Sequence, residues 1–323
     1  MADISSSAKK AYKKALKAKK KKLKTSHWLF IQKGDSGKEI ASKVFTQFAV
    51  LVLIVCIAIL GNELRLSIST KQLNTSLQDL YNKYISSEIF GEKGELLPSA
   101  NALLAINEDT AGWVTIEDTN INLPVVLRKT SDGNEYYLNR SFDGSTNKAG
   151  TLFLDYRSEL DYKDRSDNLI IYGHNQKDKT MFGDLANYKK NIEFYRDHPI
   201  IKFSSNYVAD DYKIFAFFVT PVEPHQTADG IIFDYHNYID LSDREVFDEF
   251  IDNINLRNEI TTPVDVKFGD EILTLSTCSN EFEPSRFVVF ARKVRENEDT
   301  VVETNRATIN PNAKEPDWSV IYG

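Results

Sequence analysis

The chain has 323 residues and a formal net charge of −7, and this modest total hides a strong division of charge along the sequence. Residues 1–43 contain 13 lysines and three acidic residues, whereas residues 62–323 contain 27 Lys and Arg against 44 Asp and Glu, a net charge of about −17. Such an acidic C-terminal part argues against nucleic acid as its partner, because phosphate backbones bind basic surfaces.

The uncharged segment 44–61 separates these two parts and has the length that crosses a membrane. A helix that spans the hydrocarbon core takes roughly 17 to 25 apolar residues, so we interpret the segment as a transmembrane anchor. A cleaved signal peptide is the alternative, but the basic lead is long and no small-x-small cleavage site follows Leu60. Because lysines gather on the cytoplasmic side of a first helix, the N-terminus is expected inside the cell and residues 62–323 outside.

The lysine-rich tail, residues 1–43, is therefore expected to be cytoplasmic. Its lysine run at 9–24 interleaves only Ala, Leu and one Tyr. RNA binding is one interpretation of such a run, but a topogenic or lipid-attracting role explains it more simply. The partner expected for this end of the chain is the lipid bilayer and not nucleic acid.

Residues 62–98 follow the anchor and are predicted to form the helical N-terminal part of the extracellular region. From 62 to about 88 the sequence contains no Pro or Gly, and its apolar residues recur at helical spacing. The expected structure is an amphipathic helix or helix pair that packs on the domain that follows.

Residues 99–295 follow a different sequence pattern, in which short runs rich in β-forming residues alternate with turn residues. Many short strands separated by turns are typical of a barrel or a sandwich, so this part is predicted to be the catalytic or binding domain of mainly β structure. The runs expected as strands are 113–116, 122–127, 136–138, 151–154, 169–172, 200–203, 212–219, 265–268, 272–277 and 286–292.

One helix is expected to interrupt these strands, at 243–254, where apolar residues form a single stripe behind an N-cap at Ser242 or Asp243. The chain then ends in a polar tail, residues 296–323, which is expected to be loosely held. Its aromatic residues Trp318 and Tyr322 are able to dock on the domain.

Cys278 is the single cysteine of residues 62–323 and ends the run 272–278. A lone thiol outside the membrane has no disulfide partner, so a chemical role is a serious candidate. In an extended strand Ser276 and Cys278 share the more polar face, which places the thiol at a strand end on that face. A small buried hydrophobe is the competing interpretation, since most free cysteines behave in that way.

Nucleophilic cysteine catalysis also needs a proton donor or acceptor and a group that stabilises an oxyanion. Among the five histidines, His174 has the most suggestive context, because it ends an apolar strand after Gly173, which permits a sharp turn. A satisfied structural histidine is the alternative. Arg286 opens the strand that follows Cys278, so a tight hairpin carries its guanidinium toward the thiol, although an ordinary ion pair is the more common fate of such a residue. Arg292, at the other end of that strand, is the weaker candidate.

Metal and phosphate chemistry find no support in the sequence. No spacing of histidines and acidic residues suggests a metal site, and no glycine-rich phosphate loop is present. The chemistry is therefore expected to need neither a metal nor a cofactor.

The run 273–278 resembles the TLxTC signature of sortases, the membrane-anchored cysteine transpeptidases of Gram-positive bacteria. Companion motifs that resemble the class B members occur in the expected order at 150–156, 168–175, 181–185 and 286–292. The resemblance covers about 62–295, and the helix at 243–254 is similar to the class B insertion. It implies a closed sortase-type β-barrel of about eight strands, decorated with helices.

The resemblance also implies a role for each candidate residue. Cys278 is the nucleophile, His174 is the general acid and base, and Arg286 stabilises the substrate and the oxyanion. The thiol attacks the threonyl carbonyl of a C-terminal sorting signal, and an amino group of a cell-wall precursor resolves the thioester. The implied partners are therefore secreted proteins that carry a sorting signal and a peptidoglycan amine.

Further residues near the thiol are expected to contact the substrate without catalytic roles. Ser276, Thr277 and Asn280 are the candidates for lining the groove. The choice of sorting motif is expected to depend on the shape of the loops around residues 220–262.

Three alternatives remain beside wall attachment. A related enzyme that joins pilin subunits through a lysine, or that mainly hydrolyses sorting signals, keeps the same chemistry. A non-enzymatic binding domain on a membrane stalk would leave the cysteine inert. A papain-like protease is discounted, because its cysteine usually precedes its histidine, whereas here His174 precedes Cys278 by 104 residues.

Overall fold

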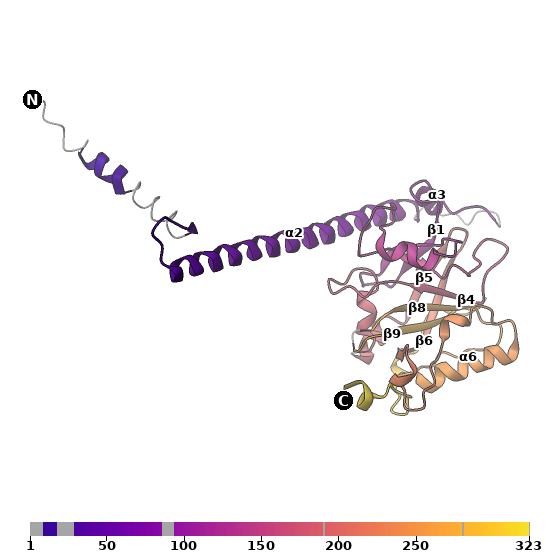
Figure 1. The fold of residues 1–323 in the computed structure, drawn as a ribbon. Coiled ribbons are helices and arrows are strands. Elements are labelled where there is room, and N and C mark those ends of the chain that lie inside the picture. The colour runs from indigo at the N-terminus through magenta and orange to yellow at the C-terminus, as the bar shows by residue number, and fades with distance from the viewer. Residues whose placement is uncertain (1–8, 18–28, 86–93, 190, 280, 323) are drawn as a thin grey trace, which may run out of the picture. The chain divides into compact units, whose positions relative to one another are not determined.

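The computed structural model describes residues 9–17, 29–85, 94–189, 191–279 and 281–322. The chain forms two compact units, Met1–Leu66 and Ser67–Gly323 (Figure 1). Helix α2, Gly37–Ile85, contributes to both units and contains the predicted anchor. Of the helices within the described ranges, it is the one that is long and apolar enough to cross a membrane.

The C-terminal part of α2 packs on the domain, as the apolar spacing predicted. Leu77 and Tyr81 are buried there. The Tyr81 ring stacks on Trp113 at a centroid distance of 4.4 Å, and its hydroxyl donates to Ser204 Oγ at 3.0 Å. Residues 86–93 lie outside the described ranges, and a short helix, α3 (Pro98–Leu104), then leads to the first strand.

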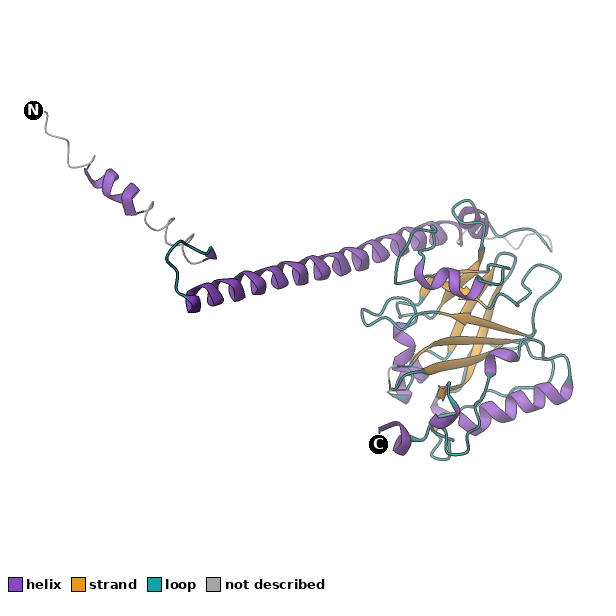
Figure 2. Ribbon diagram, in the orientation of Figure 1, coloured by secondary structure: helices purple, strands orange, loops and turns teal. Residues whose placement is uncertain are grey.

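Eight strands close into a barrel in the order β1-β2-β3-β4-β8-β9-β6-β5, which confirms the predicted fold class (Figure 2). The pairs β2–β3 and β4–β8 are parallel, and the remaining pairs are antiparallel. The strands are β1 Thr110–Thr115, β2 Asn122–Val126, β3 Leu152–Leu154, β4 Asn168–Tyr172, β5 Ile200–Ser205, β6 Ala209–Pro221, β8 Ile272–Cys278 and β9 Ser285–Lys293.

The barrel has two hydrophobic layers, one inside it and one on its outer surface under helix α6, Arg244–Arg257. Asp243 caps α6, as predicted, by accepting hydrogen bonds from the next turn. Strand β8 serves both layers, because Leu273 and Leu275 face the interior while Ile272 faces the outer layer. The alternation predicted for this strand is therefore confirmed, with both of its faces covered.

Two of the predicted strands are wrong. Residues 136–138 belong to the helical turns α4, Gly133–Tyr136, and η1, Tyr137–Asn139. Burial of the Tyr137 ring, whose hydroxyl donates to Asp109 at 2.8 Å, overrides the local strand preference.

Residues 265–268 are also not a strand. The side chains of Arg292 and Arg295 donate hydrogen bonds to the backbone carbonyl and to the carboxylate of Asp265. The carbonyl of Asp265 is therefore bonded to side chains and not to a neighbouring strand. The sequence patterns also missed a small second sheet, in which β7, Ile260–Thr261, pairs with β10, Thr308–Ile309.

The residues after β9 are held more firmly than expected. Glu298 pairs with Arg292 and Lys213, and Trp318 and Tyr322 of helix α7 both dock on the barrel unit, as their aromatic character suggested.

Candidate active site

The sheet topology brings the three predicted catalytic residues to one end of the barrel. Strands β4 and β8 are parallel neighbours in which Tyr172 is opposite Ser276. His174 and Cys278 each lie two residues farther along, so they leave adjacent strands at the same level and on the same face. In the antiparallel β8–β9 ladder, Arg286 is the direct partner of Cys278.

A cavity of about 260 Å³ opens at this end, and all three residues line it. The remaining lining residues come from neighbouring strand ends and from α4 and η1. They are Asn134, Leu138, Phe153, Tyr172, Gly173, Ser276 and Thr277. The Cys278 side chain is exposed, so the competing interpretation of a buried hydrophobic thiol does not describe it.

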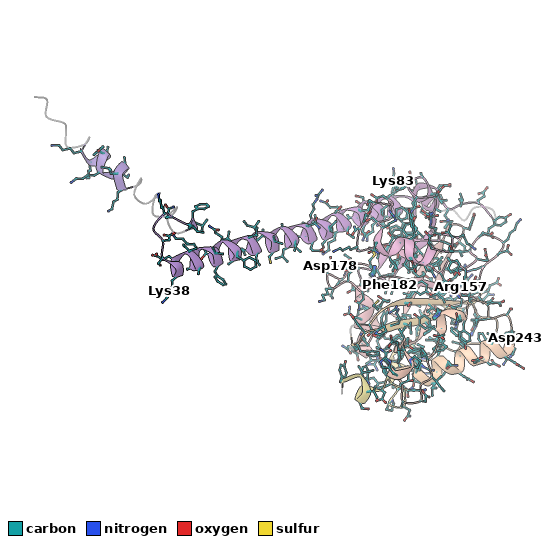
Figure 3. All side chains as sticks on the ribbon, viewed as in Figure 1. Lys38, Lys83, Arg157, Asp178, Phe182 and Asp243 are labelled. Carbon is teal, nitrogen blue, oxygen red and sulfur yellow. The ribbon has the colours of Figure 1, made fainter. Side chains whose placement is uncertain are left out.

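The His174 ring is held by its backbone and by one hydrogen bond. Its Nε2 lies 2.7 Å from the carbonyl oxygen of Leu138, and because a carbonyl only accepts, Nε2 carries a proton. Nδ1 is then the nitrogen that exchanges a proton in the neutral ring. The loop after His174 closes where the Phe182 N–H donates to the His174 carbonyl at 3.0 Å. Phe182 is labelled in Figure 3 among the side chains of the barrel unit.

Gly173 has a different use from the one expected. Its φ is not positive, so a left-handed turn is not the reason for glycine here. A Cβ at this position would overlap the side chains of Leu152 and Phe182. Gly173 therefore lets the strand end before His174 approach the barrel core closely.

Arg286 carries a charge that no carboxylate neutralises within the described part of the chain. Its Nη1 donates a hydrogen bond to the Ser285 carbonyl oxygen at 3.0 Å, and the side chain is partly exposed. No acidic side chain among the described residues lies within ion-pair distance of it. The guanidinium is thus free to bind an oxyanion or a substrate carbonyl in the cavity.

The three expected groove residues differ in what the structure says of them. Ser276 and Thr277 line the cavity, but they are only 1% and 2% exposed, and both hydroxyls are engaged. Ser276 Oγ lies 2.6 Å from the Tyr235 hydroxyl, and Thr277 Oγ1 donates to the Gly173 carbonyl at 2.7 Å. Asn280 lies outside the described residues.

Sequence reasoning missed several residues that support the site. Tyr235, from the short helix η4, Tyr235–Asn237, is buried behind the strand end, and its burial raises the pKa of its phenol, while the positive charge of Arg286 opposes that shift. It comes from a loop without periodicity, so no local pattern marked it. Tyr172 lies on the same strand face as His174, which the alternation of side chains along the strand predicts. Its hydroxyl donates a hydrogen bond to Asp155 at 3.0 Å.

Asn175 is another missed contact, because it ties the histidine loop directly to the cysteine. Its side-chain amide donates to the carbonyl oxygen of Cys278 at 2.9 Å.

Among the residues that the structure describes, no group of three or more His, Cys, Asp and Glu side chains is placed to hold a metal ion. The cavity brings together a thiol, an imidazole and a guanidinium.

Comparisons with known proteins identify the family of this chain. The sortase domain model matches residues 114–294. Sortase B of Staphylococcus aureus is 30% identical over 258 residues, which cover 78% of this chain and 98% of that protein. Sortase B of B. anthracis in complex with AAEK1 superposes with a TM-score of 0.60 at 29% identity, over 72% of this chain and 100% of that one. A Staphylococcus aureus sortase B–substrate complex gives a TM-score of 0.59 at 28% identity, over 71% and 98%.

Proposed function

Because this chain belongs to the sortase family of cysteine transpeptidases, we propose that it cleaves a C-terminal sorting signal at a threonyl carbonyl and transfers the protein to a cell-wall amino group. The observation that carries the proposal is the shared cavity of Cys278, His174 and Arg286, which come from three adjacent strands. A solved substrate complex of a sortase B supports a protein substrate of this kind.

In the first half of the proposed reaction, the Cys278 thiol gives its proton to His174, its sulfur attacks the threonyl carbonyl carbon and a tetrahedral oxyanion forms. Arg286 donates to that oxyanion, in the way that preorganised donors stabilise acyl-transfer transition states. The carbon–nitrogen bond then breaks, and His174 gives a proton to the departing amine. The product is a thioester on Cys278 and a free C-terminal fragment of the substrate.

In the second half, an amino group of a cell-wall precursor attacks the thioester carbonyl. His174 accepts the proton that this amine loses and Arg286 again donates to the oxyanion. The carbon–sulfur bond then breaks, and His174 passes that proton to the departing sulfur. The new amide bond joins the secreted protein to the wall, and the thiol returns to its starting state. Atoms and charge balance without any further reagent.

The membrane anchor completes the proposal. The apolar part of α2 is the candidate span, and the 13 lysines before it favour an N-terminus on the cytoplasmic side. The barrel unit then faces outward, where secreted substrates and wall precursors meet it. Family membership sets aside the non-enzymatic binding domain that the sequence alone had left open.

The proposal is tested with the full chain in detergent micelles and a panel of sorting-signal peptides. Intact-mass spectrometry should show an acyl adduct that disappears when triglycine is added, together with a peptide–triglycine product. The Cys278→Ala chain is the matched control and should form no adduct. A chain that forms no adduct with any peptide, although its thiol alkylates readily, contradicts the proposed reaction. An adduct that only water removes identifies a sorting-signal hydrolase.

A further inference from the structure

The chain continues beyond the matched residues 114–294, and its last part returns to the barrel. We call residues 308–322 the strap. Its first residues form β10, which pairs with β7. Farther along, the Lys314 N–H donates to the Leu256 carbonyl at 2.8 Å, and the Asp317 N–H donates to the Gln226 carbonyl at 2.9 Å. The strap is therefore fastened to the long segment that connects β6 with β8.

The other end of the strap is helix α7, Trp318–Tyr322, which contacts the loop 281–284. The Trp318 ring meets Phe282 edge-on at a centroid distance of 5.6 Å, and the Tyr322 hydroxyl donates to the Glu281 carbonyl at 2.7 Å. The two rings of α7 also stack on each other at 5.8 Å. The Trp318 ring thus connects the strap with this loop.

The loop 281–284 leads through Ser285 to Arg286. Phe282 anchors it in the barrel core, where its side chain is 9% exposed, and the Lys189 ammonium pairs with Glu281 at 2.5 Å. The β8–β9 ladder pairs the backbones of Cys278 and Arg286, and the loop leads directly into the strand end that carries Arg286. Only Ser285 separates the loop from Arg286, so a displacement of the loop reaches the start of β9.

We propose that the strap is a positioning element of the transpeptidase and that Trp318 and Tyr322 hold the loop so that the Arg286 guanidinium faces the reacting carbonyl. This inference rests on the proposed function of Arg286. Misplacement of a catalytic group by about 1 Å costs up to about 100-fold in rate, so a contact remote from the reacting atoms is able to set the rate. Neither aromatic residue lines the site cavity, so neither is a catalytic residue.

The test measures the rate of acyl-adduct formation by the full chain in micelles, using a peptide that the unchanged chain accepts. Trp318→Ala should lower the acylation rate about 10-fold, and Trp318→Phe, which keeps an aromatic edge contact, should restore most of it. Tyr322→Phe removes a single hydroxyl and should lower the rate a few-fold without any risk to folding. Val320→Ala is the control, because Val320 lies on the same helix and is 53% exposed.

A double mutant separates positioning from a general loss of stability. If the strap acts through Arg286, the chain with both Trp318→Ala and Arg286→Ala should acylate no more slowly than Arg286→Ala alone. Losses that multiply in the double mutant overturn the inference, and so does a Trp318→Ala chain that acylates at the unchanged rate. An unchanged chain that forms no adduct with any peptide overturns the proposed function itself, so the two failures are distinct.

Discussion

The two ends of strand β9 carry the same residue type in opposite surroundings. Arg286 and Arg292 lie on the same face, six residues apart. Arg286 is partly exposed and has no carboxylate partner among the described residues, whereas Arg292 is 1% exposed and bonds Glu298 at 2.5 Å and Asp265 at 3.2 Å. A buried guanidinium needs such partners, because an uncompensated charge in the interior is strongly unfavourable. An arginine that remains unpaired at a cavity is the one available to a substrate.

The comparison therefore separates the end of the barrel that carries the proposed catalytic residues, called the catalytic end, from a structural end. The catalytic end holds a thiol, an imidazole and a guanidinium around a cavity. The structural end holds a network of ion pairs around Arg292, Arg295 and Glu298. Substitutions at the first end should change rate and spare stability, and substitutions at the second should do the reverse.

The largest effect on this comparison is expected from Cys278→Ala. Acyl transfer should fall to background because the nucleophile is gone, and His174→Ala should have nearly the same effect because proton transfer is lost. The thermal midpoint of Cys278→Ala should stay within a few degrees of the unchanged chain, since the thiol is exposed. Near-native turnover by either variant, measured as product formed with triglycine, contradicts the assignment of the catalytic end.

Arg286→Ala should lower kcat/KM about 100-fold or more, as removal of an oxyanion donor does. Its free energy of unfolding should change little, because no ion pair with a described residue is lost. Peptide kinetics together with chemical denaturation measure both quantities. A large loss of stability with an unchanged rate would place Arg286 with the structural residues.

Arg292→Ala is the matched substitution at the structural end. It leaves the Glu298 carboxylate and its neighbours without their guanidinium, and the free energy of unfolding should fall by about 3–5 kcal/mol. The rate per folded molecule should remain near that of the unchanged chain. A drop in kcat without a drop in the denaturation midpoint would show that the two ends are not independent.

The smallest expected effects concern the pH dependence of stability. Glu298 and Glu259 are expected to change stability with pH in opposite directions. Hydrogen bonds from Arg292 and Lys213 hold the pKa of Glu298 well below its ordinary value of 4.5. The stability that Glu298 contributes is present above pH 4.5 and is lost as the pH falls through its depressed pKa. Glu298→Gln should flatten this acid loss in thermal melts recorded from pH 5 downward, and an unchanged slope would contradict it.

Glu259, near the catalytic end, should behave in the reverse way. Burial raises the pKa of its carboxyl to about 7 from an ordinary value of 4.5. Its contribution is then fully present below pH 4.5 and is lost as the pH rises toward 7. Glu259→Gln should remove this loss of stability between pH 4.5 and pH 7. Thermal melts of Glu259→Gln and Glu298→Gln at the same pH values compare the two pH dependences directly.

Much of the fold was accessible from sequence because the strands of this barrel carry strong local patterns. Leu273 and Leu275 face the interior as their alternation predicted, and α6 begins at its predicted cap. The predictions failed where a distant partner decides the conformation. Tyr137 is fixed by Asp109, and Asp265 is fixed by arginines that lie farther along the chain.

The candidate site shows the same contrast between residues with a local sequence signal and residues placed by distant contacts. Cys278 stood out as the lone thiol, and position marked His174 and Arg286 as candidates, whereas their catalytic roles were expected from the resemblance to sortases. Tyr235 was missed because it reaches Ser276 from 41 residues away, and no periodicity marks its loop. The roles of these residues stay predictions until the substitutions above are measured.

The parallel pairing of β4 with β8 also dictates when the protein acquires its activity during synthesis. Asn168 pairs with Ile272, and bringing such distant strands together carries a loop-closure cost that is met only late in folding. Translation proceeds from the N-terminus, at about 5–20 residues per second, so the imidazole emerges several seconds before the thiol. A nascent chain therefore lacks the proposed nucleophile until Cys278 has been synthesised. If Cys278 acts as proposed, an unfinished chain is unable to form the thioester.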